Sequence, residues 1–243
     1  MSEEDSAASV RCVWGIGTPR SFRVHWMLSE LGLPYETRAI LPRHPSMEDP
    51  GFRARSLRGK IPLYEDGDVL IGESGAIVLW LAESHAERQP LIPPPASPAR
   101  AACLELCLYA LNELDSPLYT IRLHGGLPEV YGEAPAAVAA AQKYFVRMVG
   151  EIERRLEDGR PHLLGDRFTI ADLMVATCLD WGLRLDLPMA DPVLSFNERI
   201  SKRPAFRKAI KINYPPEARA HLAGRTGADP QAPHTERIDH RKP

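Results

Sequence analysis

The sequence contains few cysteines, few aromatic residues and almost no net charge. Its 243 residues include 4 Cys and 7% aromatic residues, and 30 Lys and Arg against 32 Asp and Glu give a net charge of −2. A charge so close to zero supplies no broad basic surface for nucleic acid. No apolar run reaches the roughly 20 residues of a membrane helix, and the acidic stretch at residues 1–9 lacks the apolar core of a signal peptide. We therefore expect a cytoplasmic protein with no nucleic-acid partner and no membrane segment.

Metal and dinucleotide motifs are also missing. The four cysteines lie in separate apolar stretches without the close spacing of a disulfide framework, which is typical of buried, reduced thiols. Cys103 and Cys107 are one helical turn apart, but no neighbouring Cys or His completes a ligand set, and the histidines are scattered. The glycines of residues 15–17 lack the third glycine of a dinucleotide-binding loop. We expect no metal site.

Proline, in contrast, is abundant, and its distribution divides the chain. Residues 89–98 include five prolines, a composition that excludes a helix and favours an extended connector. After residue 214 the sequence becomes rich in Pro, Gly and charge, which favours an extended or disordered segment. We therefore expect five segments: a flexible amino-terminus at 1–10, a first domain at 11–86, a linker at 87–97, an all-helical domain at 98–213 and an extended or disordered tail at 214–243.

The first domain mixes strand and helix patterns, so an α+β fold is expected. The β-rich run 12–16 precedes a helical pattern at 21–32, and a second strand pattern follows at 35–40. Strand patterns at 61–65 and 69–72 flank Asp66-Gly67-Asp68, a strong hairpin signal because glycine adopts positive φ easily. A helix follows from Ser74. The second domain shows four helical patterns, at residues 99–122, 135–159, 169–185 and 193–206, the first with a possible kink near Pro117.

One acidic residue in the second domain could be catalytic or structural. Asp172 lies three residues after Thr169, so each side chain can accept a hydrogen bond from the other residue's main-chain N–H, in a variant of the capping box. Phe168 and Leu173 are placed to form the accompanying hydrophobic staple. A catalytic acid is the alternative, and we interpret Asp172 as a cap.

Three segments resemble cytosolic glutathione transferases. They are LRGKIPLYEDGDVLIGESGAIVLWLAE at 57–83, GDRFTIADLMVA at 165–176 and RSFRVHWMLSELGLPYE at 20–36, and the order of elements agrees from about residue 11 to about residue 210. The resemblance implies a thioredoxin-like α+β domain followed by an all-α helical bundle. It also implies a homodimer that uses glutathione as co-substrate, acts on a hydrophobic electrophilic small molecule and serves in detoxification.

The resemblance also implies the residues that bind glutathione. It predicts a cis bond between Ile61 and Pro62, which would present the main-chain groups of Ile61 to the tripeptide as an added strand. Ser74, at a helix start, would bind the carboxylate of the γ-glutamyl residue, and the Glu73 side chain would accept a hydrogen bond from the ammonium group of the same residue. Lys60 would contact the glycine carboxylate. Each has a simpler alternative: an ordinary strand-start proline, a serine N-cap and a solvated lysine.

The residue that activates the thiol is expected in the segment T-P-R-S at 18–21. This segment occupies the place of the C-P-x-C motif of thioredoxin-like proteins, and hydroxyls replace both sulfurs, which excludes an internal disulfide. It resembles the serine-type start of zeta-class transferases and is also theta-like, because a hydroxyl residue stands there. The resemblance implies that the hydroxyl of Thr18 donates a hydrogen bond to the glutathione thiolate, with Ser21 as the alternative donor. Thr18 before Pro19 would equally suit a helix N-cap. Arg20 replaces a zeta-class cysteine, which argues against the isomerase activity of that class. We include Arg20 among the expected glutathione-binding residues, where it could add positive potential or contact substrate, and the alternative is a merely exposed arginine.

We therefore expect a transferase that conjugates glutathione to an electrophile. The alternatives are a glutathione-binding protein with a non-catalytic or interaction role, or a glutathione-dependent isomerase, dehalogenase or reductase, the last disfavoured by the missing cysteine. The acceptor pocket should lie between the domains. Leu111, Asp115, Tyr119 and Arg122 have the helical spacing to line it, and the same spacing suits a core or dimer face.

Overall fold

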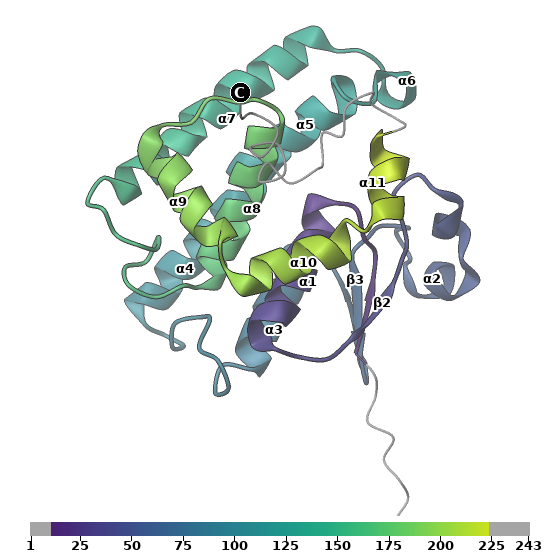
Figure 1. Cartoon of the computed structure of the whole chain (residues 1–243), viewed down its shortest axis with the longest axis horizontal. Coiled ribbons are helices and arrows are strands. Elements are labelled where there is room, and N and C mark those ends of the chain that lie inside the picture. The colour runs from purple at the N-terminus through teal and green to yellow at the C-terminus, as the bar shows by residue number, and fades with distance from the viewer. Residues whose placement is uncertain (1–10, 224–243) are drawn as a thin grey trace, which may run out of the picture.

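The computed structural model describes residues 11–223 and contains a mixed four-stranded sheet followed by a helical bundle (Figure 1). The sheet order is β2-β1-β3-β4, with β1 parallel to β2 and antiparallel to β3, and β3 antiparallel to β4. The first domain consists of β1 (Cys12–Trp14), α1 (Pro19–Leu31), β2 (Glu36–Arg38), the 3₁₀ turn η1 (Pro45–Glu48), α2 (Pro50–Arg55), β3 (Leu63–Asp66), β4 (Val69–Gly72) and α3 (Ser74–Ser84).

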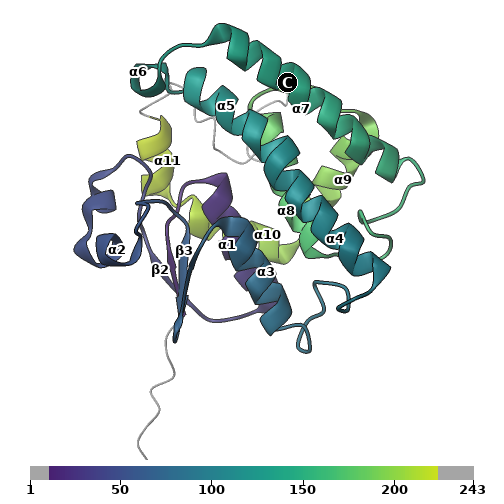
Figure 2. The same ribbon diagram turned by 180° about the vertical axis from the view of Figure 1, so that it is seen from behind.

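The two faces of the sheet are covered by different helices, and the alternation of side chains along β1 explains why. Val13 points into the large core shared with α1 and α3, whereas Cys12 and Trp14 point to the other face and pack with Phe52 of α2. Figures 1 and 2 show α1 and α3 on one side of the sheet and α2 on the other. The predicted α+β domain is confirmed, while α2 was not predicted because its six residues are too few to show periodicity.

The second domain is helical, as predicted. It contains α4 (Pro98–Tyr109), the π-helical turn η2 (Ala110–Asp115), α5 (Ser116–His124), α6 (Pro128–Tyr131), α7 (Pro135–Leu156), α8 (Ile170–Arg184), α9 (Asp191–Ser201), α10 (Pro204–Asn213) and α11 (Pro216–Ala223). The predicted helix at 193–206 is two helices, α9 and α10, because the chain turns at Arg203 before Pro204. None of the described helices is long and apolar enough to cross a membrane.

The long helix that begins the second domain is interrupted by the π-helical turn η2. Figure 2 shows α4, η2 and α5 as one long helical rod. Pro117 has no N–H to donate to the preceding turn, and the wider π turn lies directly before it, as expected where proline interrupts a helix. The turn ends at the buried Asp115, whose carboxylate reaches α1. The kink near Pro117 stays a prediction, while the π turn that precedes Pro117 contributes to the interface between the domains.

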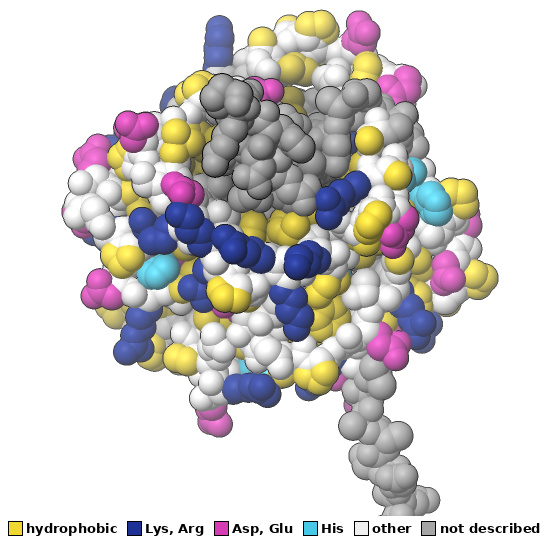
Figure 3. Space-filling view, in the orientation of Figure 1, with side chains coloured by type: hydrophobic (Ala, Val, Ile, Leu, Met, Phe, Trp, Pro, Cys, Tyr) yellow, Lys and Arg dark blue, Asp and Glu magenta, His cyan; other side chains and the backbone are white. Residues whose placement is uncertain are grey.

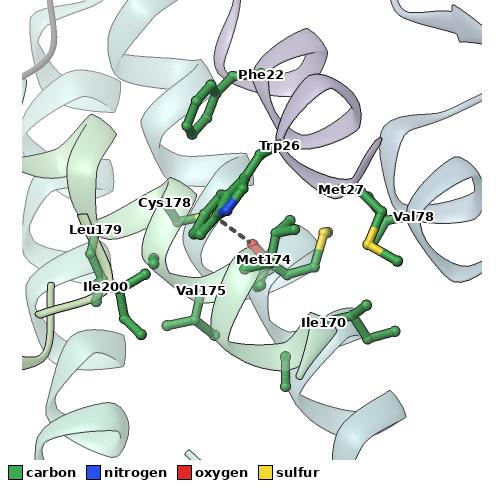
Figure 4. Close-up of a cluster of buried hydrophobic side chains, with 14 of the residues drawn as sticks. Phe22, Trp26, Met27, Val78, Ile170, Met174, Val175, Cys178, Leu179 and Ile200 are labelled. Atoms are coloured by element: carbon green, nitrogen blue, oxygen red, sulfur yellow. Dashed lines mark hydrogen bonds between the residues drawn. The ribbon is translucent and has the colours of Figure 1, made fainter. Parts of the chain in front are cut away.

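Helix α8 forms the centre of the core, and all its residues but Leu183 are buried. Its buried Asp180 and Arg184 form an ion pair at 3.0 Å. Figure 4 shows Met174, Val175 and Cys178 of α8 beside Phe22 and Trp26 of α1. Because α1 belongs to the first domain and α8 to the second, the two domains share one hydrophobic core.

The start of α8 carries the capping box predicted from Thr169 and Asp172. The Asp172 carboxylate accepts from the Thr169 main-chain N–H at 2.8 Å, from the Thr169 hydroxyl at 3.2 Å and from the Leu163 N–H at 2.8 Å. Burial raises the pKa of Asp172 to about 6, although the hydrogen bonds from Leu163 and Thr169 act in the opposite direction. Asp172 lines neither of the two cavities described below, which supports the structural role.

We expect Asp172→Ala to lower the free energy of unfolding by about 2 kcal/mol, because it removes a helix cap and leaves buried N–H groups unpaired. Chemical denaturation well above pH 6, where this carboxylate is ionised, measures the change. Asp166→Ala, at an exposed position in the same loop, is the matched control and should change stability by less than about 0.5 kcal/mol. Unchanged stability with lost activity in Asp172→Ala would instead indicate a catalytic acid.

The predicted extended tail is wrong for residues 216–223, which form α11. Pro216 occupies the first turn, where proline suits a helix, and Ala218 and Leu222 recur at helical spacing. Ala218 packs with Ile16 and Leu41 at the end of the sheet, and these tertiary contacts stabilise a helix that is rich in Ala. The rest of the predicted tail, 224–243, and the predicted flexible segment 1–10 lie outside the described residues.

Lys and Arg side chains gather in a row over α9 and α10 on the face shown in Figure 3. The exposed Lys and Arg residues of α9, α10 and the turn between them are Arg199, Lys202, Arg207, Lys208 and Lys211. Lys202 pairs with Glu198 at 2.7 Å, in an i,i+4 arrangement typical of a solvated helix surface. None of these residues lines the two cavities of the candidate site.

Candidate functional site

The first cavity lies where β3 and α3 begin, facing α5. It has a volume of about 440 Å³. Its lining includes all six residues predicted to bind glutathione, namely Arg20, Lys60, Ile61, Pro62, Glu73 and Ser74. These residues come from three segments of the chain, and the fold of the first domain brings them together.

The Ile61–Pro62 peptide bond is cis and forms one wall of this cavity. The main-chain N–H and C=O of Ile61 make no hydrogen bond with any other residue of 11–223, so they are available to pair with an extended peptide. Gly15, at the end of β1, has φ of +122°, and a Cβ there would lie only 2.6 Å from the Ile61 Cβ. A glycine is therefore needed for β1 to approach this turn so closely.

Lys60 is exposed on the same turn, and its main chain is held in place by Ser56. The Ser56 hydroxyl accepts from the Lys60 N–H at 3.1 Å and donates to the Lys60 carbonyl at 3.2 Å. The ammonium of Lys60 forms no ion pair within residues 11–223. The loop thus fixes the position of a cation at the cavity mouth.

The first turn of α3 forms the opposite wall. Ser74 is the first residue of the helix and is 5% exposed, so an anion bound beside it would meet the main-chain N–H groups that the first helical turn leaves unpaired. Glu73 precedes it with φ of +62°, a conformation that non-glycine residues adopt rarely and that is common at ligand-binding sites. The Glu73 carboxylate pairs with Arg58 at 2.9 Å, but both side chains are about two-thirds exposed, so the pair contributes little stability.

Behind Ser74 lies a buried ionic cluster formed by Arg20, Arg23 and Asp115. The Asp115 carboxylate lies 2.5 Å from Arg20 Nη2 through Oδ1 and 2.9 Å from Arg23 Nη2 through Oδ2. Arg23 also donates to the Ser74 hydroxyl at 3.3 Å and to the Cys178 sulfur at 3.0 Å. Burial opposes ionisation of Asp115, but the two guanidinium groups outweigh it and hold the pKa of that carboxyl below its ordinary value. The cluster thereby ties α1, α3, η2 and α8 together.

A second cavity of about 310 Å³ adjoins the first and shares Arg20, Lys60, Ile61 and Tyr119 with it. Thr18 lines this second cavity. Of the four residues considered for an acceptor pocket, Tyr119 and Arg122 line it, Asp115 pairs with one of its lining arginines, and Leu111 packs against Gly75 instead.

The two candidate hydroxyls occupy different environments. Ser21 is fully buried and bonds to Asn213 Oδ1 at 2.8 Å, so its hydroxyl faces α10 and not a cavity. Thr18 is half-buried and caps α1, since its Oγ1 accepts from the Ser21 N–H at 2.9 Å. Thr18 Oγ1 also contacts Ser21 Oγ at 2.8 Å, and either hydroxyl can be the donor there, so donation to a ligand requires the Thr18 hydrogen to turn away from Ser21. The predicted N-cap is confirmed, and capping is compatible with donation to a ligand.

Several lining residues of the second cavity were not identified from the sequence. They are Arg43, Met47, Tyr131 and Trp181. They lie in the η1 region, in α6 and in α8, and no local motif joins them. Only Trp181, an aromatic residue near the end of an apolar helix, gave any signal, and a core position would give the same signal.

Among residues 11–223, no three His, Cys, Asp or Glu side chains cluster closely enough to hold a metal ion. Cys12, Cys103 and Cys178 are buried free thiols and Cys107 is half-buried. Burial raises the pKa of Cys178 to about 12, so it remains a neutral thiol beside Arg23. None of the four cysteines lines either cavity.

Comparisons of the sequence with family models and with known proteins agree on one family. Residues 17–89 match the sequence model of the glutathione S-transferase N-terminal domain, and residues 135–206 match that of the C-terminal domain. The chain is 31% identical over 217 residues to glutathione S-transferase 3 of Zea mays, covering 84% of this chain and 95% of that protein. It is 28% identical to the disulfide-bond oxidoreductase YfcG of Escherichia coli, covering 79% of this chain and 91% of that protein.

A solved structure shows the same fold. The glutathione transferase URE2P8 from Phanerochaete chrysosporium, crystallised with oxidised glutathione, superposes with a TM-score of 0.76, covering 90% of this chain and 99% of that one at 19% identity. The matching domains, their order and the 31% identical plant relative together establish that this chain belongs to the glutathione S-transferase family.

Proposed function

We propose that this protein conjugates the sulfur of glutathione to an electrophilic small molecule, with the first cavity holding glutathione and the second the acceptor. The observation that carries this proposal is the convergence of all six predicted binding residues on one cavity that adjoins a second lined by Thr18. Glutathione pairs with the main chain of Ile61 as an added strand. Its γ-glutamyl carboxylate binds at the start of α3 beside Ser74, its ammonium at Glu73 and its glycine carboxylate at Lys60.

The thiol then lies beside Thr18 at the start of α1. A free thiol titrates at about 8.5, so most of it is protonated at neutral pH. The Thr18 hydroxyl donates to the thiolate, and the N-terminal end of α1 adds positive potential, so ionisation becomes easier. Holding the acceptor in the adjoining cavity provides the proximity that accelerates attack by the sulfur. Arg20, fixed by Asp115, contributes further positive charge between the two cavities.

Calorimetric titration with reduced glutathione and a conjugation assay with a chlorodinitrobenzene test this function. We expect binding and turnover in the wild type, and a 10- to 100-fold weaker affinity in Ser74→Ala, because a charge-assisted hydrogen bond contributes about 1.5–3 kcal/mol. Ser84→Ala, at the exposed far end of the same helix, is the matched control. Binding without turnover would favour the non-catalytic role, and absence of both would contradict the proposal.

Thiol–disulfide exchange is a second candidate, favoured by the relative named as a disulfide-bond oxidoreductase. The two adjoining cavities could hold glutathione and a disulfide side by side. The glutathione sulfur would attack one sulfur of the disulfide, and the other sulfur would leave as a thiol. A second glutathione would then attack the glutathione sulfur of the mixed disulfide, which releases the remaining half as a thiol and forms glutathione disulfide. The bound tripeptide supplies the nucleophile, so the missing active-site cysteine does not exclude this reaction.

We also propose the homodimer that the family resemblance implied, together with a cytoplasmic location and a role in detoxification. Exposed apolar side chains support the dimer: Trp80 on α3 is 41% exposed and Leu108 on α4 is 59% exposed, and both helices lie on the face seen in Figure 2. Leu57, beside the first cavity, is 100% exposed. Large exposed apolar residues are typical of association surfaces.

A further inference from the structure

We propose that Asn213, the last residue of α10, is a positioning residue for glutathione conjugation. Its buried side-chain amide holds the segment 17–21 in the place from which the Thr18 hydroxyl reaches the sulfur. This inference rests on the proposed function and adds a residue of the helical domain to it. It is carried by the hydrogen bonds of one amide group and by the place of that group in an otherwise apolar interface.

Asn213 stands on the buried face of α10. The other buried residues of this helix are Phe206, Ala209 and Ile210. The Phe206 ring packs edge-on against Phe22 of α1, with the ring centres 5.0 Å apart, and Figures 1 and 2 show α10 beside α1. Asn213 is 0% exposed, and an amide can be buried at little cost only where its polar atoms are hydrogen-bonded. The interface therefore contains one polar side chain that apolar packing alone does not explain.

The amide of Asn213 bridges two residues at the start of α1. Its Nδ2 donates to the Thr18 main-chain carbonyl at 3.1 Å, and its Oδ1 accepts from the Ser21 hydroxyl at 2.8 Å. The main-chain carbonyl of Asn213 accepts from the Gly17 N–H at 2.8 Å. These three hydrogen bonds connect the end of α10 with the segment 17–21, and two of them depend on the side chain.

The amide also determines where the Ser21 hydroxyl hydrogen points. The Thr18 carbonyl lies 3.0 Å from Ser21 Oγ, but it already accepts from the Phe22 N–H at 2.9 Å and from Asn213 Nδ2, which uses both of its lone pairs. The Ser21 hydrogen is therefore directed to Asn213 Oδ1. In the 2.8 Å contact between the two hydroxyls, Thr18 is then the donor. A thiolate competes with the neutral Ser21 oxygen for this hydrogen, and the charged acceptor forms the stronger bond.

Asn213 lines neither cavity, so it acts through Thr18 and not by contact with a ligand. The other end of the same helix pair is joined separately, because Arg203, just before α10, donates to the Glu30 carboxylate of α1 at 2.7 and 2.8 Å. Loss of the Asn213 amide therefore releases only the end of α1 that carries Thr18. A displacement of about 1 Å at a catalytic group is enough to slow a reaction strongly.

Two variants remove both side-chain bonds, Asn213→Leu, which keeps the bulk, and Asn213→Ala, which avoids a clash from the branched side chain. We expect kcat for conjugation of a chlorodinitrobenzene to fall about tenfold in each. The Kd for reduced glutathione, measured by calorimetry, should stay within about twofold of the wild type, because Ile61 and Ser74 bind the tripeptide in the first cavity. The bound thiol should titrate closer to the free value of about 8.5 than it does in the wild type.

Asn197→Ala is the matched control. Asn197 is a buried asparagine of α9 that lines neither cavity, so its replacement can lower stability but should leave kcat and the ionisation of the bound thiol unchanged. All rates are compared at a temperature where each protein is folded.

The double variant Thr18→Ala with Asn213→Ala tests whether Asn213 acts through Thr18. Its kcat should equal that of Thr18→Ala alone, because no hydroxyl remains to be positioned. If the two losses multiply, or if Thr18→Ala turns over like the wild type, the inference is overturned.

Unchanged kcat and unchanged thiol ionisation in a folded Asn213 variant would also overturn this inference and leave the proposed function intact. Equal losses of glutathione affinity and of kcat would overturn it as well, since that pattern indicates a general structural role. A wild-type protein that neither binds nor conjugates glutathione would instead contradict the proposed function itself.

Discussion

Replacing Thr18 by alanine lowers kcat/KM for glutathione conjugation by roughly 10- to 1000-fold, because the thiolate loses its hydroxyl donor. Of the two hydroxyls in the segment 18–21, only that of Thr18 lines a cavity. The same change removes the α1 cap, which costs about 1 kcal/mol of stability, so activity must be compared at a temperature where both proteins are folded. Steady-state kinetics with saturating glutathione measures the effect.

Two variants separate the donor role from the capping role. Thr18→Ser keeps both and should retain most of the activity. Ser21→Ala should mainly lower stability, because the Ser21 hydroxyl bonds to Asn213 and to the Thr18 main chain within the packed interface of α1 and α10. Wild-type turnover in a folded Thr18→Ala protein would rule out Thr18 as the donor and leave Arg20 as the remaining candidate on the cavity wall.

Replacing Asp115 by asparagine destabilises the protein by about 3–5 kcal/mol, because it leaves the charge of the buried Arg23 without its counterion, whereas Arg20 is partly exposed and can be hydrated. Arg23 is 0% exposed and cannot turn to solvent. Glu198→Gln, which breaks the exposed pair with Lys202, is the control and should change stability little. Equilibrium denaturation of both variants at neutral pH measures the difference, and similar small losses in both would contradict the role assigned to the cluster.

The pH dependence of stability gives an independent check on the same cluster. The pKa of Asp115 is lower in the folded protein than in the unfolded chain, so its ionised form stabilises the fold. This contribution is fully present above the ordinary pKa of aspartate, about 3.9, and is lost as the pH falls through the lower folded value. The wild type should therefore lose more stability than Asp115→Asn on acidification below about pH 4.

The parts of the fold that depend on neighbouring residues could be predicted from the sequence. The hairpin turn at Asp66-Gly67-Asp68, the capping box of Thr169 and Asp172 and the helix start at Ser74 each require only a few adjacent residues of the right type. Two walls of the first cavity could be predicted for the same reason, because the motif at 57–83 contains both the turn at Pro62 and the start of α3.

Features that join distant residues could not be predicted in this way. Arg20 and Asp115 are 95 positions apart, and their contact depends on the packing of α1 against the π turn before α5. Helix α11 forms because Ala218 meets Ile16 and Leu41, a contact that the Pro-rich composition around residue 216 does not indicate. The second cavity gathers Arg43, Tyr131 and other side chains from separate elements, so its lining could be identified only in three dimensions.

The ionisation of bound glutathione tests the central claim most directly. With protein in excess of glutathione, the ultraviolet absorbance of the thiolate is followed as a function of pH. We expect the bound thiol to ionise well below the value of about 8.5 typical of a free thiol, and the shift to disappear in Thr18→Ala. A bound thiol that titrates like the free tripeptide would contradict the activation of glutathione at the start of α1.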